Sequence, residues 1–435
     1  MAEKLQKIHV GLIGLGTVGT GVAKTLLERP DWFARRAGVP VILKRICTRH
    51  PNRARPVRLR AGLVTTDARR LLRDPELQVI IELMGGIHPA REFVLEAIRA
   101  KKHVVTANKA LLAQHGAEIF QAAARAGVDV YFEASVAGGI PIIKALREGL
   151  VANEIQALYG IINGTSNFIL SEMARENCSF DAALKDAQAR GYAERNPALD
   201  VNGMDAAHKL SILSLLSFGK TVAPADMFVE GIPGITQNDL RYAHDLGYAI
   251  KLLAIGKREG SELELRVHPT LLPRQHPLAR VNGVYNAIYV KGDLVGEQLF
   301  YGQGAGRWPT TSAVLADLVD VARNIAFNAP RRVPALTPGS PVRRIRRMGE
   351  VEGRYYFRFS CIDRPGVLAR IARILGAHRI SIASVIQPDR RREQIVPLIM
   401  VTHEARERDA QEAMRLIDRL GVIRRRTVAL RIERG

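Results

Sequence analysis

Short apolar runs and amphipathic stretches alternate along the first 150 residues of the chain. Residues 7–13 form a β-branched apolar run that ends at Gly14, and a helical stretch follows from Thr17 to about Arg29. The same alternation continues in apolar runs at 39–48, 77–86, 103–107 and 128–135 and in amphipathic stretches at 88–102 and 108–127. This order predicts βαβ units, in which a parallel sheet is covered by helices on both faces.

The pattern changes after about Asn153, where strands and helices occur in separate groups. Strand-like runs lie at 154–163, 262–272 and 283–292, and helical stretches lie at 165–177, 179–191 and 204–218. Grouping of this kind predicts an α+β domain with its own sheet.

A third part follows a segment rich in proline and arginine. Residues 330–347 have little periodicity and indicate a linker, and the runs after it follow the order βαββαβ. We therefore predict an α/β protein with domains at 1–150, 151–330 and 350–435 and a linker at 331–349.

Composition narrows the class of protein. The apolar runs are shorter than the roughly 18 to 20 residues that a membrane span needs, and we recognise no signal peptide, so we expect no membrane association. The three cysteines are far apart in sequence, which favours a reducing cytoplasm over a disulfide framework or zinc site. The net charge of +21 is spread along the chain without a nucleic-acid-binding motif, so we expect no nucleic-acid partner.

A glycine motif marks the end of the first strand. Gly14, Gly16 and Gly19 form GxGxxG between a strand and a helix, with Thr17 and Val18 opening that helix. The first glycine suits the tight turn, the second a close approach of backbone to pyrophosphate, and the third helix–strand packing. We predict a Rossmann-type nucleotide-binding domain.

The second strand favours one cofactor over the other. It ends in KRICTRHPNRAR, without the carboxylate that would take the ribose 2′-OH of NAD. Lys44, Arg45, Arg49 and Arg53 are basic candidates to face the 2′-phosphate of NADP. We favour NADP, with Arg49 as the contact, and keep NAD as the alternative.

The stretch GYAERNPALDVNGMDAAHKL places several charges before an apolar run. Asp205 and Lys209 lie four residues apart, so they share one face of a helix. An exposed pair there would contribute little to stability, but the apolar turns that follow indicate that this face is buried. Glu194 and Asp200 precede the pair. Charges of both signs at a buried face are hard to explain as scaffolding alone.

Five motifs together resemble homoserine dehydrogenase. They are GLGTVG, VTANK, EASVAGGIP, NGTSNFIL and GYAERNPALDVNGMDAAHK, in that family's order and spacing. The segment with DRPGVLARIARILGAHRISIASVIQ resembles an ACT domain, which is a small-ligand regulatory module. No amino-acid kinase precedes the first strand, so the resemblance is to the monofunctional enzyme.

The resemblance implies an activity and a set of site residues. The family reduces L-aspartate 4-semialdehyde to L-homoserine with NADPH or NADH, in threonine, methionine and isoleucine biosynthesis. It implies Lys209 as proton donor, Asp205 as a substrate or water ligand, and Lys109 beside the nicotinamide and the aldehyde; which lysine delivers the proton stays open. It also implies Gly191, Glu194 and Asp200 for substrate, with orientation of Lys209 as the other role open to Asp200, and Thr106, Lys109 and Gly306 for cofactor.

Two further sites follow from the same resemblance. Backbone atoms of Glu133, Val136, Gly138 and Ile140 match a monovalent-cation loop, with sodium the expected ion. In the ACT module, the loop Asp363, Arg364, Pro365 and Gly366 is expected to bind an effector, with L-threonine as the ligand. A homodimer or homotetramer is expected.

Two other functions stay as alternatives. Another Rossmann-type dehydrogenase of small aldehydes or ketones shares this layout but lacks the constellation from Glu194 to Lys209. A non-enzymatic, basic sensor of nucleotides and amino acids would tolerate Lys209→Ala.

Overall fold

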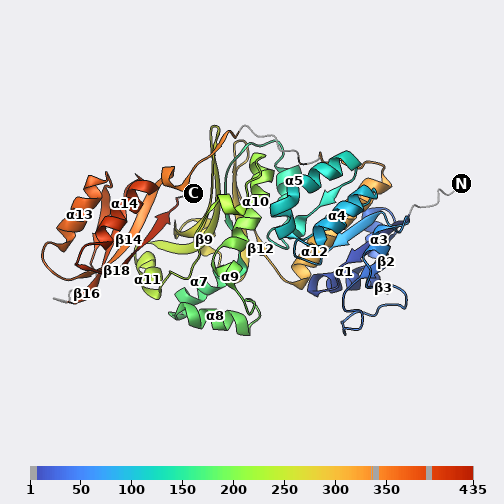
Figure 1. Ribbon diagram of the computed structural model, residues 1–435, viewed down its shortest axis with the longest axis horizontal. Coiled ribbons are helices and arrows are strands. Elements are labelled where there is room, and N and C mark those ends of the chain that lie inside the picture. The colour runs from blue at the N-terminus through green and yellow to red at the C-terminus, as the bar shows by residue number, and fades with distance from the viewer. Residues whose placement is uncertain (1–6, 335, 337–341, 388–393, 435) are drawn as a thin grey trace. The chain divides into compact units, whose positions relative to one another are not determined.

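The computed structural model describes residues 7–334, 336, 342–387 and 394–434. These form two compact units (Figure 1). The first unit comprises Met1–Gln156, His208–Asp226 and Asn286–Pro341, and the second comprises Ala157–Ala207, Met227–Tyr285 and Val342–Gly435. The predicted linker at 331–349 lies partly outside the described residues, at 335 and 337–341. The division into four segments stays a prediction.

The first unit contains the predicted parallel sheet. Its strand order is β3-β2-β1-β4-β5-β6, which is the doubly wound order of dinucleotide-binding domains. All described pairings in this sheet are parallel. The strands are β1 (Ile8–Ile13), β2 (Val41–Cys47), β3 (Val64–Thr65), β4 (Val79–Glu82), β5 (His103–Thr106) and β6 (Val130–Tyr131).

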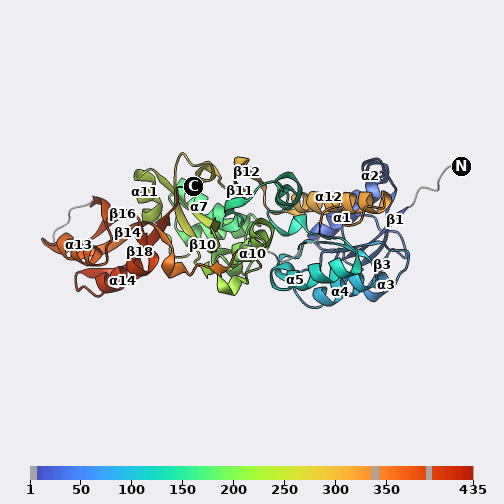
Figure 2. The same ribbon diagram turned by 90° about the horizontal axis from the view of Figure 1, so that it is seen from above.

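Helices cover both faces of this sheet (Figure 2). One face carries α1 (Thr17–Glu28), α2 (Pro30–Ala37) and α12 (Arg307–Ala326), and the other carries α3 (Arg69–Leu72), α4 (Ala90–Arg99) and α5 (Lys109–Ala126). Fully buried apolar side chains on β1 pack in the core between the sheet and α1 and α12. The Rossmann-type prediction is confirmed.

The strand predicted at 128–135 is wrong beyond Tyr131. The chain forms a 3-10 turn over Glu133–Ser135 instead. The N–H of Glu133 donates to Asp317 Oδ2 at 2.8 Å, and its carboxylate accepts from the N–H groups of Ile143 and Lys144 at 2.8 Å each. These bonds turn the backbone away from the sheet.

In the second unit, one sheet runs through the predicted α+β domain and the C-terminal module. Within this unit the strand order is β7-β9-β10-β18-β14-β16-β15. β10 pairs antiparallel with β9 and parallel with β18, through Thr270↔Arg431 and Leu271↔Ile432. The strands are β7 (Ile155–Ile161), β9 (Tyr248–Glu259), β10 (Glu262–Pro273), β14 (Glu352–Ile362), β15 (Ile382–Ile386), β16 (Ile395–Thr402) and β18 (Ile423–Ile432).

The predicted βαββαβ order of the C-terminal module is confirmed. Its helices α13 (Val367–Ala377) and α14 (Glu407–Asp418) lie on one face of its strands (Figure 2). Elsewhere in this unit the helices are α7 (Gly164–Glu176), α8 (Phe180–Ala189), α9 (Ala198–Val201) and α11 (Gln237–Asp245). Helix α10 (Met204–Phe218) holds residues of both units, and β11 (Tyr285–Gly292) and β12 (Gly296–Gln303) lie almost entirely in the first.

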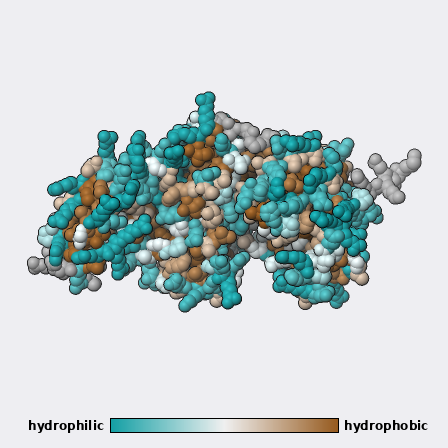
Figure 3. Space-filling model, in the orientation of Figure 1, coloured by the Kyte–Doolittle hydropathy of each residue, from teal (hydrophilic) through white to brown (hydrophobic). Residues whose placement is uncertain are grey.

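Hydrophilic side chains cover much of the surface in view, with apolar residues in scattered patches (Figure 3). Among the described residues, no helix has both the length and the apolar character needed to cross a membrane. Cys47, Cys178 and Cys361 are free thiols.

Candidate functional site

The glycine turn has the geometry that the motif predicts. A Cβ at Gly14, where φ is +101°, would meet the Leu83 carbonyl oxygen at 2.5 Å, and one at Gly19 would meet the Gly14 oxygen at 2.0 Å. A Cβ at Gly16 would meet no described atom within 4 Å. Gly16 is the N-cap of α1, and Thr17 and Val18 follow it in the first turn. The open side of this turn therefore leaves room for a phosphate at the helix N-terminus.

A pocket of about 660 Å³ lies beside this turn. Arg49, Arg53 and Arg55 line it together with Gly14 and Gly16. Basic side chains and a glycine turn in one pocket suit a phosphorylated nucleotide.

Lys44 and Arg45, two other basic candidates, are held elsewhere. Lys44 contacts Asp74 at 3.0 Å and also Glu76, and Arg45 lies 3.5 Å from Asp74. Neither is among the described residues that line the pocket.

Asp67 also lines this pocket. We expected no carboxylate there, because the second strand ends without an acidic residue. Asp67 follows β3, and its Oδ1 accepts the N–H of Arg69 at 2.9 Å. This bond places the carboxylate at the start of α3, so its position has a structural cause as well.

A buried carboxylate ties two strand ends together. Glu82 Oε1 accepts from the N–H of Met84 at 2.8 Å, and its Oε2 accepts from the Thr106 hydroxyl at 2.7 Å. Burial raises the pKa of Glu82, against the hydrogen bonds that lower it. Asn108 donates to the Gly86 carbonyl at 2.6 Å and caps α5, whose first residue is Lys109. The Thr106 hydroxyl is therefore bonded to Glu82. The cap by Asn108 fixes the backbone at the start of α5, next to Lys109.

The acidic stretch is organised by Asn163. Its Nδ2 donates to Asp200 Oδ1 at 2.7 Å and to Asp205 Oδ2 at 2.8 Å. Its Oδ1 caps α7 by accepting from the N–H of Ser166 at 2.8 Å. One amide side chain therefore brings together two carboxylates that are five positions apart in sequence.

Two hydroxyls hold the loop before these carboxylates against α7. Ser166 donates to the Asp200 carbonyl at 2.9 Å, and Thr165 donates to the Tyr192 carbonyl at 2.7 Å. Gly191 has φ of +75°, and Glu194 is exposed. The loop is thus anchored at both ends, with the Glu194 side chain directed to solvent.

Burial of the helix face that carries Asp205 and Lys209 is confirmed. Asp205 is 4% exposed and Lys209 is 8% exposed. Both side chains lie on α10, one turn apart. A buried ammonium one turn from a buried carboxylate is suited to proton transfer.

The predicted cation loop contains two successive residues in the left-handed region, Ala137 and Gly138, each with φ of 52°. A Cβ on Gly138 would meet the Gly304 carbonyl oxygen at 2.4 Å, which requires glycine at this position. The carbonyls of Glu133 and Ile140 accept backbone N–H groups at 3.4 and 2.8 Å. Because each oxygen has two lone pairs, these bonds leave it able to face a cation as well. Gly306, two residues after Gly304, is the N-cap of α12 with φ of 115°.

In the C-terminal module, the loop from Asp363 to Gly366 precedes α13. Gly366 caps this helix with φ of +87°. Asp363 Oδ1 accepts from Gln387 at 3.2 Å, whereas its Oδ2 is shielded from solvent and accepts no hydrogen bond from the described residues. Arg364 and Pro365 lie between these two residues. A shielded acceptor beside a helix N-terminus is complementary to a zwitterion.

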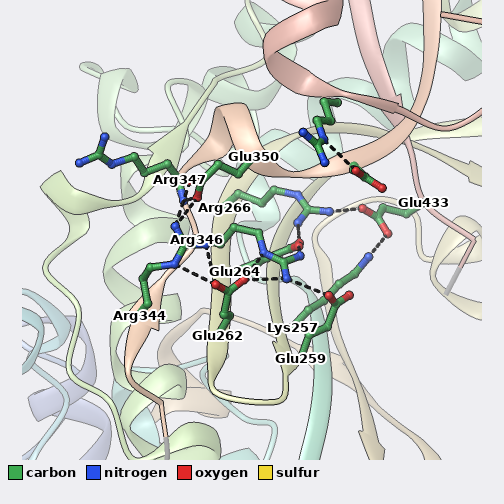
Figure 4. Close-up of polar contacts among 12 residues, drawn as sticks. Lys257, Glu259, Glu262, Glu264, Arg266, Arg344, Arg346, Arg347, Glu350 and Glu433 are labelled. Carbon is green, nitrogen blue, oxygen red and sulfur yellow. Dashed lines mark hydrogen bonds and ion pairs between the residues drawn. The ribbon is translucent and has the colours of Figure 1, made fainter. Parts of the chain in front are cut away.

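Ion pairs join this module to strands β9 and β10 of the same sheet (Figure 4). Arg266 on β10 is buried between Glu264 and Glu433, and Glu433 also accepts from Lys257 at 2.6 Å. Arg346 contacts Glu264 at 2.6 Å, beside Glu259 and Glu262 at 2.9 Å each. The charges connect β9, β10, the segment around Arg346 within the predicted linker, and Glu433, which directly follows β18.

His268, next to this network, predicts a pH dependence of stability. Burial, with Arg431 and Arg266 nearby, holds its pKa well below 6.5, so the folded state keeps it neutral. The unfolded state binds a proton at His268 below about pH 6.5. The contribution of this residue therefore lowers the free energy of unfolding as the pH falls, by about 1.4 kcal/mol per pH unit. We expect His268→Gln to reduce this slope between pH 6.5 and 5, measured by urea denaturation with circular dichroism. An unchanged slope would contradict it.

Several residues of these sites were not singled out from the sequence. Asn163 lies in a quoted motif, and its position before a helix was the available signal. Glu82 was readable as an acid at a strand end, but nothing marked its partners. Arg55 ends the quoted basic stretch KRICTRHPNRAR but was not named as a candidate. Asp67 had no local signal, because tertiary structure brings it to the pocket.

Comparisons with known proteins agree along the chain. Residues 14–133 match the family described as homoserine dehydrogenase, NAD binding domain, residues 141–319 match homoserine dehydrogenase, and residues 355–422 match the ACT domain. The chain is 46% identical to the homoserine dehydrogenase of Pseudomonas aeruginosa and 43% identical to that of Neisseria gonorrhoeae, each over 99% of both chains.

A solved structure gives the same result. The crystal structure of a homoserine dehydrogenase from Thiobacillus denitrificans matches with a TM-score of 0.91 and 48% identity, over 98% of both chains. The chain therefore belongs to the homoserine dehydrogenase family, and it is an oxidoreductase with a nicotinamide-cofactor-binding domain and an ACT domain.

Proposed function

We propose that this protein reduces L-aspartate 4-semialdehyde to L-homoserine with NADPH, reversibly, in threonine, methionine and isoleucine biosynthesis. The observation that carries the proposal is the pair of carboxylates joined by Asn163, followed on α10 by the buried Lys209. The substrate is a small zwitterion with an aldehyde, so it needs an anion for its ammonium and a proton source for its oxygen.

The residues of the acidic stretch take the first of these roles. Asp200 and Asp205 each accept one hydrogen bond from the Asn163 amide. Because an ionised carboxylate has about four lone-pair sites, each keeps acceptor capacity for a ligand. We assign Gly191, Glu194 and Asp200 to substrate binding, and Asp205 to the substrate or to a water beside it.

Lys209 takes the second role. A reduced nicotinamide supplies the hydride when the cofactor is bound, and the aldehyde oxygen must then receive a proton. An ammonium held one turn from Asp205 can give that proton and stabilise the developing alkoxide. Lys109 at the start of α5 is the other candidate donor and is also assigned to the cofactor.

A substrate analogue tests the assignment. Succinate semialdehyde has the same aldehyde but lacks the α-ammonium. We expect the wild type to favour L-aspartate 4-semialdehyde in kcat/KM by about 100-fold or more, because the carboxylates would lose their partner. Equal values for the two aldehydes would exclude a role of these carboxylates in recognition.

For the cofactor, we assign Gly14, Gly16, Thr17, Val18 and Gly19 to the pyrophosphate, and Thr106 and Gly306 to the nicotinamide end. Arg49 is exposed, lines the pocket and lies next to Arg53 and Arg55. We assign the 2′-phosphate of NADP to Arg49 because several arginines converge there. Asp67 is the group that would bind the ribose 2′-OH if NAD were preferred.

We predict that Arg49→Met raises the KM for NADPH by about 10- to 100-fold and that for NADH by less than about twofold. A charge-assisted bond to phosphate is worth about 1.5 to 3 kcal/mol, and NADH lacks the 2′-phosphate. Initial rates with each cofactor measure both values. Equal effects on the KM for NADPH and the KM for NADH would remove the reason for choosing NADP. In that case, a higher KM for NADH in Asp67→Asn would point to NAD.

We further propose a monovalent cation, sodium in the first instance, on the backbone oxygens of Glu133, Val136, Gly138 and Ile140. The support is the left-handed backbone at Ala137 and Gly138, which turns successive carbonyls within a short loop. Its role would be to fix this loop next to the Gly304 turn.

For regulation, we propose that L-threonine binds at Asp363, Arg364, Pro365 and Gly366. The Oδ2 atom of Asp363 suits the ammonium of an amino acid, and the N-terminus of α13 suits its carboxylate. We also infer a homodimer or homotetramer, supported by the exposed Leu299 and Tyr301 on β12. Free cysteines support a reducing, cytoplasmic location.

We predict that L-threonine inhibits the wild type and that Asp363→Ala raises the half-inhibitory concentration by about tenfold or more, since a charge-assisted bond is lost. Basal kcat should stay within about twofold. Asp409→Ala, on α14 of the same module, is the control. A threonine-insensitive wild type would contradict the regulatory proposal without touching the catalytic one.

A further inference from the structure

Arg55 makes contacts that differ from those of the other arginines around the nucleotide pocket. Its Nε donates to the Leu15 carbonyl at 3.0 Å, and its two terminal nitrogens donate to the Arg53 carbonyl at 2.7 Å and the His50 carbonyl at 2.8 Å. A longer contact of 3.4 Å reaches Thr48 Oγ1. One guanidinium therefore binds the glycine turn and the loop after β2 at the same time.

The loop bound in this way carries Arg49 and Arg53. It is a short turn in which the N–H of Arg53 donates to the His50 carbonyl at 3.3 Å, and the N–H of His50 donates to Thr48 Oγ1 at 3.4 Å. Both of these bonds are long and weak. The bonds from Arg55 are shorter than these two, and with the bond of the Thr48 N–H to the Thr65 carbonyl at 3.0 Å they hold the loop in place.

Most N–H groups of Arg55 are occupied by these contacts. Three carbonyl oxygens and a hydroxyl occupy four of the five N–H directions of its planar fork. Carbonyl oxygens carry partial negative charge, and those bonded to Arg55 repel a nearby phosphate less. Arg49 and Arg53 are both exposed, which leaves their guanidinium groups accessible in the pocket.

We propose that Arg55 is a positioning residue for 2′-phosphate selectivity: it holds the loop of Arg49 and Arg53 against the glycine turn and does not itself bind the phosphate. The inference rests on the proposed preference for NADP. Lysine is a poor replacement in this role, because its three N–H groups radiate from one nitrogen and do not reproduce the planar fork that reaches both segments.

The test measures binding of adenosine 2′,5′-bisphosphate and of 5′-AMP to the full chain by calorimetry. The ratio of their dissociation constants gives the 2′-phosphate preference without turnover. We expect Arg55→Lys and Arg55→Met each to lower this preference by about tenfold. Arg58→Met, an exposed arginine of the same segment, should leave it unchanged.

A triple variant separates positioning from direct contact. If Arg55 acts only through its neighbours, Arg55→Met added to Arg49→Met and Arg53→Met should cause no further loss of preference. If Arg55→Lys kept the wild-type preference for the 2′-phosphate, the inference would be overturned, because a positive charge at this position would then be enough to maintain the preference. Equal weakening of both ligands would also overturn it, since Arg55 would then serve the glycine turn alone.

The same experiment distinguishes failure of the proposed function. If Arg49→Met and Arg53→Met leave the preference unchanged, or the wild type shows none, NADP selectivity by this loop is wrong and the role of Arg55 falls with it. If those variants lose the preference while both Arg55 variants keep it, only the inference about Arg55 is wrong.

Discussion

Replacing Lys209 with methionine is expected to lower kcat for aldehyde reduction by about 10²- to 10⁴-fold, the usual contribution of a general acid. Methionine keeps the apolar stem of the side chain, which matters because Lys209 is only 8% exposed. It removes the ammonium that we assign to the aldehyde oxygen. Rates of NADPH oxidation at saturating substrate give kcat directly.

Two controls make this result interpretable. Lys185→Met, at an exposed position of α8, should leave kcat unchanged. Quenching of protein fluorescence by NADPH should show that the Lys209 variant still binds cofactor. If Lys209→Met keeps more than about a tenth of wild-type kcat while Lys109→Met loses activity, the proton comes from Lys109 and the assignment of Lys209 is wrong.

The second large effect concerns stability. Arg266→Met is expected to lower the free energy of unfolding of the second unit. The expected loss is near the lower end of the range of about 3 to 5 kcal/mol for breaking a buried ion pair. The variant leaves Glu264 and Glu433 buried without the cation between them. Arg346 and Lys257 still pair with these carboxylates, which limits the cost. Urea denaturation followed by circular dichroism measures the change.

An exposed arginine of the same network is the matched control. Arg344 pairs with Glu262 at 2.5 Å and with Glu350 at 2.9 Å, but its side chain is half exposed, so Arg344→Met should change stability little. Hydrogen exchange should locate the effect of Arg266→Met in β10 and β18. A similar loss in both variants would show that burial does not govern this network.

Local patterns predicted the elements of this protein well. The alternation before residue 150, the glycine motif and the βαββαβ order each follow from short-range rules of periodicity and turn chemistry, and the structure has all three. The helix predicted at 204–218 corresponds to Met204–Phe218, because its apolar run begins just after the charged turn.

Features that depend on contacts between residues far apart in sequence could not be predicted from local patterns. The parallel pairing of β10 with β18 joins residues about 160 positions apart, and no local pattern encodes it. The strand predicted at 128–135 ends early because Glu133 bonds to Asp317, which is 184 positions away. Asn163 and Arg55 lie in quoted stretches, but their roles were missed because key partners, such as Asp205 and the Leu15 carbonyl, are brought close by the fold.

The most direct test of the central claim follows the reaction itself. Purified protein is mixed with L-aspartate 4-semialdehyde and NADPH deuterated at C4 of the nicotinamide, on the transferred face, and the product is analysed by mass spectrometry. We predict L-homoserine with one deuterium at its C4, formed in step with loss of absorbance at 340 nm. A folded protein that binds NADPH but yields no labelled homoserine would contradict the account.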